Sequence, residues 1–590
     1  MTRDRILDAL WLLLVGALSS AWCVTASSRL GATFDEPFYI AEGLNSWRSG
    51  SNQVLMRKGT MPLPVDAQTL PLYLWERQRG EPFDPVADLH QLLPTARLAN
   101  LPFWWLLLFY GLRWGRVLGG PWAGRLSAGL LAADPNLLAH ATLATTDIAL
   151  TATVLVASYH WLTNRGERWP RRVLLPGVLY GVALAAKASA LAFVPILWLV
   201  FGLCHLSQAG AFPPPRTGSA WGRVKAAWAD TTRLRWDMVY AFWIGIVVLF
   251  AYCGCDWQPE RSFVTWTHSL PDGPAKSALV PVSERLAIFS NAGEGLVQQV
   301  KHNVRGHHGG FVAGQWHRRA VWYYFPVALS IKLPDPTLAL LVVLLLARPR
   351  MLLNPAGWAV LALLAFSLNA RVQIGVRLVF PLVAFLIVAL AVAVCRRKPL
   401  PRPLPEAGRG GREDSGSPSP LRGGGWGEGW TGRLTAALAV FCLAWSVLVA
   451  VSAWPGGLRY INRVWGGPSR GPDLLADSNY DWGQGLPELK AWMAANEPPP
   501  VYVWYYGGDW AVMRPPFRVL MIHQMPEVTP EKVKQAVGNG YLAVSVSLLS
   551  ACPDRRPELL AIVDWLKTLE PVDRTPTFVI FRVKMKGFGR

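Results

Sequence analysis

The stretch RLVFPLVAFLIVALAVAVC (residues 377–395) has one charged side chain, at its first position, and is otherwise apolar. A helix of this length crosses the hydrocarbon core of a bilayer, which is about 30 Å thick and needs roughly 20 apolar residues. Similar runs recur along a chain of 590 residues, of which 52% are hydrophobic. The sequence therefore predicts a polytopic α-helical membrane protein rather than a string of soluble domains.

Apolar runs of spanning length predict about eleven transmembrane helices. The first run follows a basic start and reaches Cys23 through Trp22, a poor match to the small residues of a signal-peptide cleavage site, so we expect an uncleaved helix. The runs lie at 8–27, 100–118, 122–138, 143–162, 173–187, 189–207, 237–255, 321–346, 352–369, 377–395 and 434–454.

Basic segments follow every second apolar run, which places them all on the same side of the membrane as Arg3 and Arg5. The positive-inside rule makes that side cytoplasmic, which explains the net charge of +20 without nucleic acid. We therefore expect a multi-pass protein of the inner membrane with a cytoplasmic N-terminus and a periplasmic or extracellular C-terminal domain. The basic segments are 113–125, 164–172, 216–235, 348–350 and 395–412.

The chain divides into four predicted parts. Residues 1–398 form a transmembrane domain with outer loops 28–99 and 256–320. Residues 399–432, rich in Pro, Gly, Ser and Arg, form a disordered cytoplasmic linker. The last transmembrane helix covers 433–455, and 456–590 form a soluble α/β domain. Its expected strands are 500–507, 518–523, 541–549 and 577–584, and its expected helices are 486–497, 530–538 and 557–569.

Acidic residues occur at the outer ends of two apolar runs. Asp35 and Glu36 are adjacent in GATFDEPFYIAEG (31–43), followed by Tyr39, and Asp147 begins the fourth run with His140 shortly before it. Taken alone, the first pair could be solvated loop acids. An acid within an apolar helix costs on the order of 2.5–3.5 kcal/mol at mid-bilayer, so Asp147 is expected to face a polar cavity.

Basic residues occur at the same predicted level, and each has two interpretations. They extend to the interface as isolated snorkelling side chains, or they bind an anion. Acids that accept a proton and cations that hold phosphate are together what transfer from a phosphate-linked donor requires. These residues are Lys187, Lys332, Arg371 and Arg377.

Four histidines lie in HNVRGHHGGFVAGQWH (302–317). A metal site is one interpretation, but the spacing fits no closed zinc site, and a loop that contacts substrate is the other. We count His307 and His308, with Tyr39 and His140, as candidate substrate-binding residues. We predict no cofactor and no metal site, although adjacent acids could hold a divalent ion.

Six segments in order carry a resemblance to a known family. With them the chain, over about residues 10–395, resembles the GT-C superfamily of polytopic glycosyltransferases, in particular the branch with protein O-mannosyltransferases and the aminoarabinose transferase of lipid A. The segments are TFDEPFYIAEG (33–43), DAQTLPLYLW (66–75), LLAADPNLLAHATLATTDIALT (130–151), GVALAAKASALAFVP (181–195), HGGFVAGQW (308–316) with WYYFPVALSIKLP (322–334), and GVRLVFPLVAFLIV (375–388).

The resemblance implies an enzyme that takes a sugar from a polyprenyl-phosphate donor on the outer leaflet. The sugar passes, with inversion, to a hydroxyl of a protein, lipid A or another envelope glycan. By matching position, Asp35 is the general base with Glu36 beside it, and Asp147 orients acceptor or sugar. By the same resemblance, Lys187, Arg371 and Arg377 bind the carrier phosphate, with Lys332 behind them.

The chain departs from the family at Thr69-Leu70-Pro71-Leu72, where many relatives have His-Pro-Pro-Leu. The role of that histidine is then lost or moved, to His90 or to the histidines at 302–308. The C-terminal segment LLADSNYDWGQGLPELKAW (474–492) and its domain lie outside the matched core, and either read the acceptor or serve as a structural appendage. A transporter or lipid flippase is the main alternative function, and a glycan-binding scaffold is a third.

Overall fold

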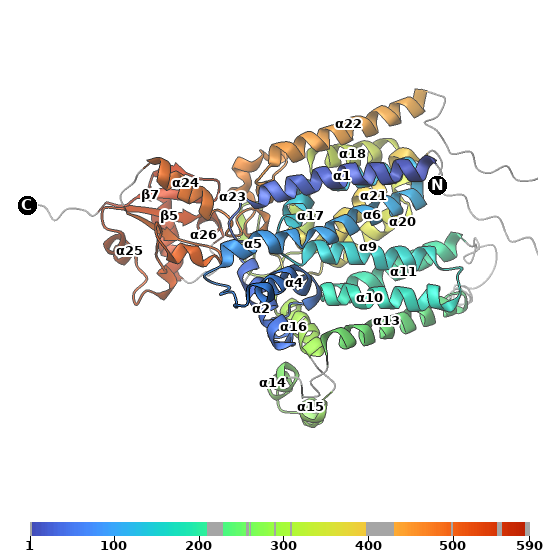
Figure 1. Cartoon of the computed structure of the whole chain (residues 1–590), viewed down its shortest axis with the longest axis horizontal. Helices are drawn as coiled ribbons and strands as arrows, with labels where there is room; N and C mark the ends of the chain where they lie inside the picture. Colours follow the sequence, from blue (N-terminus) through green and yellow to red (C-terminus); the bar gives the residue numbers. More distant parts are fainter. Residues whose placement is uncertain are drawn as a thin grey trace, which may run out of the picture.

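The computed structural model of the chain describes residues 3–208, 228–254, 259, 261–287, 291–306, 309–396, 430–496, 500–551 and 557–584. It consists of a bundle of long helices and a small sheet-containing domain at one end of the bundle (Figure 1). The N-terminus lies at the opposite end of the bundle, remote from the sheet (Figure 1).

The apolar stretch 377–395 forms the central helix of the bundle. This helix, α21 (Phe380–Cys395), is buried along almost its whole length and packs against α6, α7, α9 and α20. The bundle contains α1 (Arg3–Ser27), α6 (Leu101–Gly119), α7 (Pro121–Ala132), α8 (Pro135–Ala141), α9 (Asp147–Thr163), the π-helical turn η1 (Pro170–Leu174), α10 (Leu175–Ala186), α11 (Ala190–Gln208), α13 (Thr232–Cys253), α17 (Tyr324–Lys332), α18 (Asp335–Ala347), α19 (Pro349–Leu352), α20 (Pro355–Ser367), the 3₁₀ turn η2 (Val376–Val379) and α22 (Trp430–Ala453).

Helix covers most of every apolar run predicted to span the membrane, but two runs are broken. The run 321–346 bends by 113° between α17 and α18, at Pro334, which lacks an N–H to continue the helix. The run 122–138 divides into α7 and α8, because Asp134 accepts hydrogen bonds from the backbone of Asn136 and Leu137 and so starts a new helix.

Among the described residues, five helices are long and apolar enough to cross a membrane, or six if the bent pair is one span. The count of eleven therefore stays a prediction. The five are Arg3–Ser27, Leu89–Gly119, Ala190–Gln208, Thr232–Cys253 and Val376–Cys395.

The two predicted outer segments are largely helical. In 28–99, helices α2 and α4 pack against each other near the sheet end of the bundle (Figure 1). In 256–320, α16 packs against α3 and is followed by a two-stranded hairpin. The elements are α2 (Glu36–Ser49), α3 (Gln53–Arg57), α4 (Pro62–Arg79), α5 (Leu89–Leu98), α14 (Arg261–His268), α15 (Pro274–Arg285), α16 (Asn291–Arg305), β1 (Gly310–Val312) and β2 (Gln315–His317).

The C-terminal domain contains a five-stranded sheet in the order β4-β3-β5-β7-β6. Strands β4, β3 and β5 are parallel, whereas β7 pairs antiparallel with β5 and β6. The elements are α23 (Gly471–Leu474), α24 (Leu486–Asn496), β3 (Val501–Trp504), β4 (Arg518–Val519), α25 (Pro530–Val537), β5 (Tyr541–Ser545), α26 (Val546–Ser550), α27 (Pro557–Lys567), β6 (Pro571–Arg574) and β7 (Phe578–Arg582).

Three details differ from the expectations. The run 541–549 is strand β5 followed directly by helix α26, and edge strand β6 was not predicted because PVDR lacks an apolar alternation. Helix α22 begins at Trp430, so the predicted linker ends before 432. The rest of that linker, 399–429, lies outside the described residues.

Candidate active site

Asp35 lies at the sheet end of the bundle, directly before α2, and is a partly exposed acid of a largely buried charge cluster. Its Oδ2 lies 3.2 Å from Nη1 of Arg377 and accepts a hydrogen bond of 3.4 Å from the hydroxyl of Tyr39. The side chain is 25% exposed. Asp35 is therefore ion-paired on one side and open to solvent on another.

Arg377 holds this cluster together from η2, the turn that leads into α21. Nη1 also lies 3.6 Å from Oδ2 of Asp147, and Nε donates a hydrogen bond of 3.0 Å to Oγ of Ser478. The guanidinium carbon lies 4.1 Å from the centroid of the Trp482 ring, a cation–π contact. The arginine is thus buried against both the bundle and the C-terminal segment.

Asp147, the first residue of α9, is fully buried. Its Oδ1 lies 2.5 Å from Nζ of Lys187, which follows the end of α10, and its Oδ2 lies 3.7 Å from Nδ1 of His140. Two cations thus neutralise this carboxylate, Lys187 from one side and Arg377 from the other. The structure therefore brings together five of the predicted site residues, namely Asp35, Tyr39, Asp147, Lys187 and Arg377, with His140 at the edge.

The charge balance around Asp35 changes its acidity. Burial raises the pKa of the Asp35 carboxyl, and the positive charge of Arg377 only partly opposes the rise. The carboxylates of Asp477 and Asp147 add to it, because like charges nearby disfavour ionisation. A carboxylate with a raised pKa is a stronger base than an ordinary aspartate, which suits a group that accepts a proton.

Glu36 faces away from this cluster although it is adjacent in sequence. It is fully buried and accepts hydrogen bonds of 2.8 Å from both Nε and Nη2 of Arg97, as well as from the backbone N–H of Thr33 and Ala144. Burial by itself raises the pKa of Glu36, but the charge and hydrogen bonds of Arg97 outweigh it, so the pKa is lowered. This position does not support the expected catalytic role, and instead makes Glu36 an anchor for the loop that carries Asp35.

Two other predicted cations lie elsewhere. The ammonium of Lys332 is buried and donates to the backbone carbonyls of Leu458, Tyr460 and Asn479, so it fastens the C-terminal segment to α17. Arg371 is exposed and donates to the carbonyl of Val304. Neither position supports the expected binding of the carrier phosphate.

The other candidate histidines are not placed at the Asp35 cluster. His307 and His308 lie outside the described residues. His90, one candidate for the displaced family histidine, lies 3.1 Å from Oδ1 of Asp509 in the C-terminal domain rather than at Asp35. Within the described residues, no group of three His, Cys, Asp or Glu side chains is placed to hold a metal ion. The expectation that the protein uses no metal stays a prediction.

Sequence reasoning missed a third acid, Asp477. It adopts a left-handed backbone conformation with φ of 58°, which is unusual for a residue with a side chain. Its Oδ2 accepts a hydrogen bond of 2.6 Å from the hydroxyl of Tyr506, and burial raises its pKa against the opposing charge of Arg377. The polar run DSNYDWGQG (477–485) was the available signal in the sequence. It lies between the last apolar run and the first expected helix of the C-terminal domain.

The C-terminal domain meets the Asp35 loop directly. The backbone N–H of Phe34 donates to the carbonyl of Trp482 at 2.8 Å, and the Phe34 ring lies 5.7 Å from that of Tyr506. A Cβ at Gly375 would collide with the hydroxyl of Ser478, the same hydroxyl that accepts a hydrogen bond from Nε of Arg377. The domain is thus joined to the acidic cluster by backbone and side-chain contacts.

Comparisons with known proteins add only weak likenesses. No family model matches the chain, and no curated protein matches it. Among solved structures, the chain is similar to ArnT from Cupriavidus metallidurans bound to undecaprenyl phosphate, with a TM-score of 0.41 and 13% identity over 97% of each chain. It is also similar to the apo state of that ArnT, with a TM-score of 0.27 and 14% identity over 97% of this chain and 98% of the other. Both TM-scores fall below 0.5, so neither likeness assigns an activity here.

Proposed function

We propose that the protein is a membrane glycosyltransferase of the GT-C type that transfers a sugar from a polyprenyl-phosphate donor to an acceptor hydroxyl, with inversion. One observation carries the proposal: Asp35 is partly exposed and has a raised pKa, yet it lies against a buried arginine that two further carboxylates share. The resemblance of the segments around these residues to the GT-C superfamily supplies the reaction class.

In the proposed reaction, Asp35 accepts the proton of the acceptor hydroxyl as its oxygen attacks the anomeric carbon. A positioned base of this kind contributes about 10²–10⁴ in rate. The bond between the anomeric carbon and the carrier phosphate breaks, and the electron pair leaves with the phosphate. Tyr39 and Arg377 fix the orientation of Asp35 through its Oδ2.

Lys187 is the best-placed cation for the leaving phosphate. Its side chain is 21% exposed, whereas that of Arg377 is 7% exposed and already shared among carboxylates. Positive charge fixed near the developing phosphate stabilises the transition state most where water is excluded. In this assignment Asp147 holds Lys187 and Arg377 in position and does not itself contact the acceptor.

The sequence left two interpretations of the C-terminal domain, a part of the acceptor site and a structural appendage. Its contacts support the first better than the second. Tyr506 and Asp477 lie next to the Asp35 loop and are joined to each other by a short hydrogen bond.

The test uses the full-length protein in detergent or nanodiscs with a labelled polyprenyl-phosphate sugar. We expect acceptor-dependent release of carrier phosphate, which Asp35→Asn slows by about 10²–10⁴ and which the exposed control Asp473→Asn retains. Binding of the donor to Asp35→Asn, measured separately, shows that the variant is folded. Movement of the lipid across proteoliposomes without release of carrier phosphate would support the flippase alternative and overturn the proposal.

A further inference from the structure

A groove opens on the surface of the bundle between α11 and α20, at the end remote from Asp35. The cavity has a volume of about 680 Å³. Its walls are mainly apolar, with Val200 and Leu203 from α11 and Trp358, Leu361 and Ala362 from α20. None of these residues belongs to the acidic cluster, so the groove is a separate feature of the molecule.

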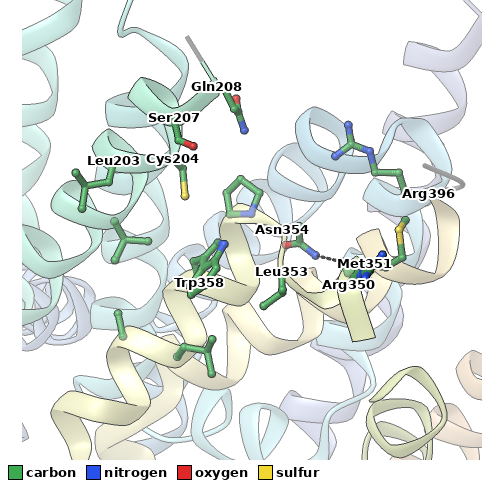
Figure 2. A pocket seen from close by; sticks show the side chains of 14 residues that line it. Leu203, Cys204, Ser207, Gln208, Arg350, Met351, Leu353, Asn354, Trp358 and Arg396 are labelled. Atoms are coloured by element: carbon green, nitrogen blue, oxygen red, sulfur yellow. Dashed lines mark hydrogen bonds between the residues drawn. The ribbon is translucent and has the colours of Figure 1, made fainter. Parts of the chain in front are cut away.

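Two arginines line this groove. Arg350 and Arg396 both line the cavity, and no acidic residue is among its lining residues (Figure 2). Within the described part of the chain, neither guanidinium has a carboxylate partner. The positive-inside rule accounts for basic residues at this end, but it does not account for an open apolar groove directly beside them.

The wall of the groove is fixed rather than collapsible. Asn354 starts α20 by accepting a hydrogen bond of 3.1 Å from the backbone N–H of Gly357. Its amide donates to the carbonyls of Met351 and Ala389, the latter in the central helix α21. The start of α20 is therefore tied to the core of the bundle, and the groove beside it persists.

The dimensions suit one lipid chain. The groove follows α20 from Asn354 to Leu361, a length of about 10 Å at 1.5 Å per residue. This lies within half of the hydrocarbon thickness, about 15 Å. Trp358, which lines the groove, is 45% exposed. Tryptophan rings favour the membrane interface, where lipid head groups lie.

We propose that the groove binds one anionic phospholipid of the bilayer. Its acyl chain lies against α11 and α20, and its phosphate lies between Arg350 and Arg396. Guanidinium groups pair with phosphate through charge-assisted, often bidentate hydrogen bonds. Basic pockets between transmembrane helices bind the head groups of acidic lipids on the same physical grounds.

The test is native mass spectrometry of the full-length protein titrated with phosphatidylglycerol and, separately, with phosphatidylcholine. We expect phosphatidylglycerol to bind about tenfold more tightly, as one charge-assisted contact supplies. The double variant Arg350→Gln/Arg396→Gln should lose this preference. The matched control Arg168→Gln/Arg171→Gln, which removes two exposed arginines beyond the end of α9, should keep it.

A second variant tests the shape of the site and leaves both arginines in place. Ala362→Trp fills the groove and should weaken phosphatidylglycerol binding. Equal binding of the two lipids, equal losses in the test and control arginine variants, or unchanged binding by Ala362→Trp would each overturn the proposal. So would displacement of the lipid by inorganic phosphate alone, or binding that arises only after deletion of residues 400–428, which would indicate that the chain's own linker fills the groove.

Discussion

Two acids at opposite ends of the helix bundle, Asp237 and Asp35, differ in how positive charge balances them. At the N-terminal end, Asp237 is 4% exposed, and its Oδ2 lies 3.2 Å from Nη1 of Arg165 and 2.9 Å from Nε of Arg172. At the sheet end, Asp35 shares one arginine with two other carboxylates and remains partly exposed. Arginine is in excess at the first site, and carboxylate is in excess at the second.

This difference separates a structural acid from a reactive one. Asp8 repeats the structural pattern, because it pairs with both Arg116 and Arg125. A carboxylate between two cations is fully neutralised and has little tendency to accept a proton. Burial and ion pairing alone therefore do not mark the site; an unbalanced, partly exposed acid does.

The largest expected effect comes from removing that unbalanced acid. Asp35→Asn should lower the rate of sugar transfer by about 10²–10⁴, because the acceptor loses its base. Asp237→Asn, at the structural end, should leave the rate per folded molecule unchanged. Single-turnover release of carrier phosphate, normalised to folded protein, measures both, and equal losses in the two variants would remove the distinction between the ends.

The stability effects should follow the reverse order. Asp237→Asn leaves two arginines without their shared carboxylate, and breaking a buried pair in this way costs about 3–5 kcal/mol. Asp35→Asn should not lower the melting temperature at neutral pH, because burial already disfavours the ionised form of that carboxyl. Thermal unfolding of the two variants in the same detergent makes the comparison, which a larger loss in Asp35→Asn would reverse.

The pH dependence sharpens the same contrast. The pKa of Asp35 is raised, and only its ionised form accepts a proton, so the transfer rate should fall on acidification at a pH above the ordinary aspartate range. Since the folded-state pKa exceeds the unfolded one, the contribution of Asp35 to stability is greatest at low pH and is lost as pH rises through that raised value. A profile of kcat/KM against pH tests the first statement, and a limb that persists in Asp35→Asn would assign it to another group.

The smallest effect concerns the contact between the two domains. Tyr506→Phe removes the hydrogen bond to Asp477, a bond to a charged group worth about 1.5–3 kcal/mol. We expect a moderate fall in transfer rate with donor binding retained, because Asp477 helps to set the charge around Arg377. Tyr502→Phe, at a half-buried tyrosine of strand β3, is the matched control. An unchanged rate in Tyr506→Phe would return the C-terminal domain to a purely structural role.

Several features were accessible from the sequence because they depend on local composition. Long apolar runs predicted helices at the correct places, and the alternation past residue 455 predicted most of the α/β domain. Asp35, Asp147, Lys187 and Arg377 were recognised as charges at the ends of apolar runs, and they do converge. The break at Pro334, by contrast, was overlooked, although a proline inside an apolar run is itself a signal that the helix ends there.

Neighbours in sequence were the least reliable guide to shared roles. Asp35 and Glu36 are adjacent, but the start of α2 turns their side chains to different partners, Arg377 and Arg97. Lys332 and Arg371 carry the same charge as Lys187 but have other partners. Lys332 donates hydrogen bonds to backbone carbonyls, and Arg371 donates one to a carbonyl at the end of a surface helix. A side chain's partner depends on packing between distant segments, which no local pattern encodes.

The sequence by itself determined that the chain forms apolar helices with charges gathered at their ends, since hydropathy and charge are properties of consecutive residues. Only the tertiary structure decided which charges meet, which acid remains unbalanced, and that Tyr506, bonded to Asp477, contacts Phe34 beside Asp35 from more than 440 positions away. The physical reason is that electrostatic energy depends on distances and burial in three dimensions. Those quantities are fixed only when the helices and the C-terminal domain have packed together.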